Sequence, residues 1–96
     1  MNLFLDTANT DCWTDLSGTA LFSGITTNPL LIQRASLKTS IETYQALYER
    51  AMKLGYPCIQ FQVFGEDWLQ CARSIASIGP EAFIKIPANK KGFEVV

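Results

Sequence analysis

The sequence predicts an α/β fold with a parallel sheet, and three observations support that prediction. Four short apolar runs alternate with segments of helical periodicity, in the order β-α-β-α-β-α-β followed by the start of another helix. Strict alternation of this kind is typical of a parallel sheet. The runs are apolar on more than one face, which fits strands covered by helices. A polar side chain also lies near the carboxyl end of each run, where α/β proteins gather their chemistry.

The expected strands are short, and glycine or proline separates them from the helices. We expect strands at residues 3–6, 24–28, 59–64 and 82–87. Asn9 can cap a short first helix that ends before Gly18. The longest helix is expected at about residues 36–54, because apolar residues recur there at intervals of three and four. Gly55 and Pro57 would end that helix.

Two more helices complete the expected order. The third begins near Glu66 and ends at Gly79 and Pro80. The fourth begins at Asn89 or Lys90, close to the last residue of the sequence. No repeat or low-complexity tract interrupts the chain, so we expect one structural unit over residues 1–96.

Composition excludes several classes of function. The hydrophobic fraction of 48% is ordinary for one small globular domain. The 8 basic and 9 acidic residues are scattered, so no basic stripe suggests nucleic-acid binding. No apolar run approaches the roughly 20 residues that cross a membrane. The first residues also lack the pattern of a signal peptide. We therefore expect no membrane association and a cytoplasmic location.

The chemically reactive residue types are limited. The three cysteines form no CxxC pair, and their odd number favours reduced thiols that act as small buried hydrophobes. The chain has no histidine, which is the commonest general base and metal ligand. No metal-ligand cluster is visible, and we expect no metal site. Any chemistry must therefore use lysine, carboxylate, amide or hydroxyl groups.

Four polar residues mark the expected strand ends. Asp6, Asn28, Gln62 and Lys85 lie 22, 34 and 23 residues apart. A (β/α)8 barrel uses roughly 31 residues per unit and places its chemistry at the carboxyl ends of its strands. The observed spacing is a little tight but compatible with such a barrel. Alternation along the second strand puts Thr26 on the same face as Asn28.

Each of these residues also has a simpler interpretation. Asp6 could be a turn or cap residue, and Asn28 precedes proline as turn initiators do. Gln62 could be a solvated strand residue. Lys85 could be an edge-strand lysine that discourages aggregation. Their shared position at strand ends favours a common site.

The residue types suit Schiff-base chemistry. A lysine amine must be unprotonated to attack a carbonyl, and burial of Lys85 in its apolar strand would disfavour the ammonium form. Asp6 could transfer the protons that imine formation requires. The amides of Gln62 and Asn28 could orient a water molecule or a substrate hydroxyl. None of these steps needs a metal.

One stretch carries a resemblance to a known family. Gly24-Ile25-Thr26-Thr27-Asn28-Pro29-Leu30-Leu31-Ile32 resembles the second-strand motif of the transaldolases. Three further segments agree with that family in order and spacing: Leu3-Phe4-Leu5-Asp6-Thr7-Ala8, Phe61-Gln62-Val63, and Ile84-Lys85-Ile86-Pro87 with Gly92 beyond. Together the four segments cover essentially the whole chain.

The resemblance implies an enzyme with a (β/α)8 TIM barrel that forms a Schiff base on the lysine matching Lys85 and uses no cofactor. It also implies that Asp6 acts in proton transfer. Asn28 would bind hydroxyls of the dihydroxyacetone portion of the substrate, with Thr26 beside it. Gln62 stands where transaldolases proper tend to carry glutamate and fructose-6-phosphate aldolases carry glutamine, which favours the aldolase branch. Asn89 departs from the threonine usual at its position, yet both can cap a helix.

The resemblance assigns residues 1–96 to the amino-terminal half of such a barrel, its first four βα units. The implied substrate is a sugar or sugar phosphate, and the full-length family member is expected to be a homo-oligomer. Because the residues of the other four strands are lacking, we expect little turnover from this chain.

Two alternative roles remain. The chain could be an inactive half-barrel remnant or an interaction module that associates through open sheet edges. A flavodoxin-like binding module is disfavoured, because Asp6-Thr7-Ala8-Asn9 is not a glycine-rich phosphate loop.

Overall fold

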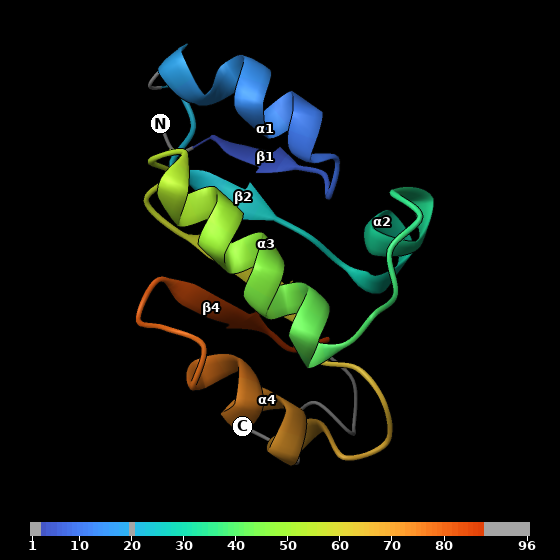
Figure 1. The fold of residues 1–96 in the computed structure, drawn as a ribbon. Coiled ribbons are helices and arrows are strands. Elements are labelled where there is room, and N and C mark those ends of the chain that lie inside the picture. The colour runs from blue at the N-terminus through green and yellow to red at the C-terminus, as the bar shows by residue number, and fades with distance from the viewer. Residues whose placement is uncertain (1–2, 20, 88–96) are drawn as a thin grey trace.

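The structure is a computed structural model that describes residues 3–19 and 21–87. These residues form a parallel four-stranded sheet in the order β1-β2-β3-β4. The strands are β1 (Phe4–Asp6), β2 (Gly24–Thr26), β3 (Ile59–Gln62) and β4 (Ala82–Lys85). The predicted α/β class and parallel strand order are confirmed, and the open sheet is consistent with half of a TIM barrel. The arrowheads of β1, β2 and β4 point the same way in Figure 1, so the carboxyl ends lie along one side.

Helices follow each of the first three strands. They are α1 (Thr10–Leu16), continued by the 3-10 turn η1 (Ser17–Thr19), then α2 (Pro29–Arg34), α3 (Ile41–Lys53) and α4 (Trp68–Ala76). In Figure 1, α3 lies across the middle of the sheet between α1 and α4, whereas α2 lies apart at the carboxyl end of β2. No helix in the described part of the chain is long and apolar enough to cross a membrane.

Local sequence explains where the helices begin. The Asn9 side chain accepts a hydrogen bond from the Asp11 amide, as the first cap prediction requires. Ser40 accepts from the Thr43 amide, so α3 begins at Ile41. Ser36 has a φ of 62°, a left-handed conformation that belongs to a turn. The prediction of one helix over residues 36–54 was therefore wrong at its start, because its first five residues form the connection from α2 to α3.

The helix α2 was not predicted. Asn28 was expected to end the second strand, with a turn initiator as its simpler interpretation, but its side chain accepts from the Leu31 amide and Pro29 occupies the first helical position. Asparagine before proline can begin either a turn or a helix, because in both cases its side-chain oxygen accepts a hydrogen bond from a backbone amide a few residues ahead. The last three expected strands were also too long at their carboxyl ends, by two residues each, whereas the first ends at Asp6 as expected and begins one residue later. The fourth helix expected from Asn89 or Lys90 lies outside the described residues.

The core lies between the sheet and its helices. Ile25, Ile59 and Phe61 are fully buried and point toward the helical side. Tyr44 of α3 stacks on Phe61 with ring centroids 4.4 Å apart. Trp13 of α1 is fully buried as well, and its indole N–H donates to the Thr7 carbonyl over 2.9 Å. These contacts fix the helices on one face of the sheet.

Residues 3–19 and 21–87 leave the opposite face of the sheet open. Phe4 and Phe83 project from it and are 45% and 50% exposed. On the outer strand β4, Ile84 keeps 36% of its surface exposed, whereas Ile86, just beyond the strand, packs against the core. The cysteines are free thiols, with Cys58 and Cys71 buried as expected and Cys12 half-buried.

Candidate functional site

The candidate site lies on the open face, at the carboxyl ends of the strands. Asp6, Gln62 and Lys85 are the last residues of β1, β3 and β4, and Thr26 is the last residue of β2. Asp6 is the register partner of Thr26, and Gln62 is the register partner of Lys85. All four alternate with residues that face the core, so they share the open side of the sheet. The structure thus places the predicted residues along one edge.

Asp6 and Thr26 are in direct contact. The Thr26 hydroxyl donates to Oδ1 of Asp6 over 2.7 Å. Asp6 is exposed and Thr26 is half-buried, so the pair stands at the surface of the open face. A short O–H···O bond to a carboxylate is among the stronger side-chain hydrogen bonds. Thr26, predicted as a substrate-binding residue, is therefore also a partner of the predicted proton-transfer group.

Asn28 lies two residues beyond β2, where it begins α2. Its Oδ1 accepts from the Leu31 amide over 3.0 Å. An asparagine amide has a separate NH₂ donor, which this cap does not use. The residue before it, Thr27, is buried and donates from both its amide and its hydroxyl to the Gln60 carbonyl. Asn28 is thus held on a fixed backbone at the site's edge.

Gln62 is anchored through its backbone. The hydroxyl of Tyr44, a buried residue of α3, donates to the Gln62 carbonyl over 2.7 Å. Phe64 meets the Tyr44 ring edge-on, with centroids 5.5 Å apart. Burial, with a smaller contribution from the nearby Cys71 thiol, raises the pKa of Tyr44 well above its ordinary value. The hydroxyl therefore stays protonated as a hydrogen-bond donor.

Tyr44 was not recognised as part of the site from the sequence. It appeared only as one apolar residue in the helical pattern of residues 36–54. No local signal distinguishes a core tyrosine from one whose hydroxyl holds a strand end, because the acceptor is 18 residues away.

Lys85 is exposed, which contradicts the expected burial. Its strand β4 is apolar in sequence, but Lys85 projects from the open face, and the described residues do not cover that face. Asp6 and Lys85 also lie on the two outer strands. Three strand spacings of about 4.8 Å separate them, roughly 14 Å measured along the sheet. Their functional groups can meet at one substrate only through the curvature of the sheet and the length of the lysine chain.

No group of three or more His, Cys, Asp or Glu side chains is arranged to hold a metal ion in the part of the chain that the structure describes. The polar groups at the strand ends are one amine, one carboxylate, one hydroxyl and two amides. Such a set can bind a polyhydroxylated ketone and transfer protons.

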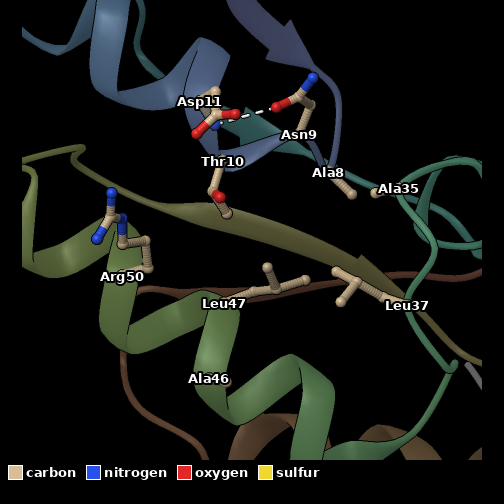
Figure 2. Close-up of a pocket in the computed structure, with 9 residues that line it drawn as sticks. All are labelled: Ala8, Asn9, Thr10, Asp11, Ala35, Leu37, Ala46, Leu47 and Arg50. Carbon is tan, nitrogen blue, oxygen red and sulfur yellow. Dashed lines mark hydrogen bonds between the residues drawn. The ribbon is translucent and has the colours of Figure 1, made fainter.

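A cavity of about 490 Å³ lies elsewhere, between the start of α1 and α3. Figure 2 shows Leu47 and Arg50 of α3 facing Asn9 and Thr10 across it. None of the strand-end residues lines this cavity. It is a groove between helices on the covered side of the sheet, separate from the candidate site.

Comparison with known proteins gives one consistent group of relatives. The chain is 31% identical over 98 residues to a probable transaldolase of Alkaliphilus metalliredigens and 32% identical over 100 residues to one of Dehalococcoides mccartyi. Each match covers the whole chain but 44% of the relative. A probable transaldolase of Phenylobacterium zucineum is 32% identical over 95 residues, with 42% of its length covered. No protein-family model matches the chain. The chain thus spans less than half the length of the curated relatives it matches.

Proposed function

The chain belongs to the transaldolase family, and from that premise we propose that it carries the Schiff-base lysine of an aldolase or transaldolase, Lys85. The observation that carries the proposal is the placement of Lys85 at the end of β4, in register with Gln62 and on the same open face as Asp6. Residues 1–96 would then be the amino-terminal half of a barrel domain, acting in the cytoplasm.

The covalent step uses the Lys85 amine. Its neutral Nζ adds to the ketone carbon, and the carbonyl π electrons move to oxygen. Two protons then pass in succession from Nζ to that oxygen, which leaves as water while a C=N bond forms. In our proposal Asp6 carries both protons, so its carboxylate ends as it began. Once protonated by solvent, the imine accepts the electron pair of the carbon–carbon bond that breaks, and the hydroxyl proton of the departing aldehyde passes to Asp6.

The amides would hold the substrate. The free NH₂ of Asn28 can donate to a hydroxyl of a dihydroxyacetone unit while its oxygen caps α2. Gln62, fixed by Tyr44, can orient a water molecule or a hydroxyl beside Lys85. Because the third-strand residue is glutamine, we propose the fructose-6-phosphate aldolase type of reaction, with a ketose or its phosphate as substrate.

Borohydride trapping tests the proposal. The chain is incubated with dihydroxyacetone and reduced with borohydride, and the modified peptides are mapped by mass spectrometry. We expect the adduct on Lys85 rather than on Lys38, Lys53, Lys90 or Lys91. Lys85→Met should abolish it, whereas the matched surface change Lys53→Met should leave it. Equal labelling of all lysines would refute the assignment of Lys85.

An interaction role is the second candidate, and the open face supports it. Phe4 and Phe83 are large apolar side chains exposed on that face. Monomeric proteins seldom leave a contiguous apolar patch uncovered. In this alternative the face serves assembly, and Lys85 acquires its reactivity only after the face is covered.

A further inference from the structure

We propose that Thr26 is a positioning residue that acts through Asp6, rather than a residue whose principal contact is the substrate. The inference rests on the proposed function, because it concerns the group that carries protons to and from the Schiff base. Its basis is the 2.7 Å hydrogen bond from the Thr26 hydroxyl to Asp6 Oδ1.

The Thr26 hydroxyl is held more firmly than the carboxylate it contacts. Thr26 belongs to the inner strand β2 and pairs with Asp6 on one side and with Gln60 on the other. Its branched Cβ leaves few side-chain rotamers. Asp6 ends the outer strand β1 and is exposed. The threonine can therefore fix the orientation of the carboxylate, and the threonine does not depend on Asp6 for its own position.

The chemistry of a hydroxyl limits what else Thr26 can do. A hydroxyl has one hydrogen, and here that hydrogen is donated to Asp6. Thr26 can still accept from a substrate hydroxyl, but it cannot donate to one without releasing Asp6. A carboxylate released in this way would lose the orientation that this hydrogen bond fixes. Loss of the Thr26 hydroxyl should therefore slow proton transfer and leave substrate affinity almost unchanged.

The test measures the rate of imine trapping against dihydroxyacetone concentration. Thr26→Val keeps the shape and removes the hydroxyl, and Thr26→Ser keeps the hydroxyl. We expect Thr26→Val to lower the maximal trapping rate about tenfold. The half-saturating concentration should stay within about twofold, because the substrate contacts remain. Thr26→Ser, which keeps the hydroxyl, should have a maximal trapping rate within about twofold of that of the unaltered chain. Thr14 is an exposed threonine on α1, so Thr14→Val is the matched control.

A double-mutant cycle separates an action through Asp6 from a general structural role. In an Asp6→Ala background, Thr26→Val should change the trapping rate by less than about twofold, because its target is already gone. A full tenfold loss in that background would overturn the inference. Circular dichroism checks folding, and Thr26→Ala serves as a second hydroxyl-free variant if the valine variant does not fold.

The outcomes distinguish the two proposals. If the unaltered chain traps no adduct on Lys85, the proposed function fails and this inference fails with it. If the unaltered chain traps an adduct and Thr26→Val traps it at the same rate, only the positioning role is wrong. If Thr26→Val instead raises the half-saturating concentration at an unchanged maximal rate, Thr26 is a substrate ligand.

Discussion

At the scale of single residues, side-chain hydroxyls hold the strand ends that carry the candidate site. Thr26 bonds to the Asp6 carboxylate, and Tyr44 bonds to the Gln62 carbonyl. The first bond is at the surface, where solvent competes for both groups. The second is in the core, where a lost partner costs about 1–3 kcal/mol. Loss of the Thr26 hydroxyl should therefore affect the chemistry more than the stability. Loss of the Tyr44 hydroxyl should affect the stability more than the chemistry.

Replacing Tyr44 tests the buried bond. Tyr44→Phe keeps the ring stacked on Phe61 but removes the donor to Gln62, and we expect a loss of about 1–2 kcal/mol in the free energy of unfolding. Urea unfolding at neutral pH measures it. Tyr48→Phe, which removes a bond to Glu81 from a half-buried hydroxyl, is the control and should cost less. Equal losses of unfolding free energy in the two variants would show that burial does not determine how much each hydrogen bond contributes to stability.

The same variant should change the pH dependence of stability. Burial raises the folded-state pKa of Tyr44 above its ordinary value of 10.0. The unfolded chain therefore loses this proton first as pH rises, so the stabilisation is complete below about pH 10 and is lost above it. Tyr44→Phe should flatten the fall in unfolding free energy above pH 10. An unchanged slope would contradict the assignment.

At the scale of elements, Asn28 joins β2 to α2 and is also the proposed substrate-binding residue of that connection. Its oxygen caps the helix, and its NH₂ group is the proposed substrate donor. A single substitution therefore mixes a structural effect with a functional one. Only a variant that preserves the capping oxygen can separate them.

Two variants at Asn28 make that separation. Asn28→Ala removes the cap and should lower the unfolding free energy by about 0.5–2 kcal/mol. Asn28→Asp keeps a capping oxygen and should stay within about 0.5 kcal/mol, yet it loses the NH₂ donor. Both should raise the dihydroxyacetone concentration needed for half-maximal trapping. If Asn28→Asp traps as the unaltered chain does, Asn28 acts only as a helix cap.

The contact between β2 and β3 depends on a glycine. A Cβ on Gly24 would lie 2.5 Å from the Cys58 sulfur and 2.8 Å from the Cys58 carbonyl oxygen. The second contact is with backbone, so Gly24→Ala must shift a strand, and we expect a loss of about 1–3 kcal/mol in unfolding free energy. Gly18→Ala is the matched control, because nothing lies within 4 Å of the added carbon. Thermal unfolding of both variants compares them, and similar transition temperatures would argue against the close approach.

At the scale of the whole molecule, the open face and the outer strands determine behaviour. β1 and β4 are the two ends of the sheet order, and Phe4 and Phe83 lie on these strands. Unpaired strand edges beside exposed aromatic rings promote association. The part of the chain that the structure describes does not cover the open face.

We predict that the isolated chain self-associates through this face. Light scattering should report species larger than a monomer at micromolar concentration, and Phe4→Ser with Phe83→Ser should shift the distribution toward monomer. Leu69→Ser is the control, because Leu69 is 46% exposed on α4, outside the open face. A monomeric unaltered chain with a sharp thermal transition would contradict the prediction.

The sequence by itself predicted the order of the strands and the position of the candidate site at their carboxyl ends. Alternating apolar runs predicted the parallel sheet, and the Asn9 cap predicted the start of α1. The polar residues at strand ends predicted that Asp6, Gln62 and Lys85 would share one edge. These features are local or follow from the period-two alternation of strands, so no knowledge of distant contacts was needed.

Only the tertiary structure decided how those residues act on one another. The bond between Thr26 and Asp6 depends on the register of β1 against β2, and the bond between Tyr44 and Gln62 depends on how α3 packs on β3. The helix α2, which begins at Pro29 after the Asn28 cap, was missed because a turn and a helix cap share one local sequence pattern. The exposure of Lys85 was missed because burial depends on what covers a face of the sheet, and no strand's own sequence contains that information.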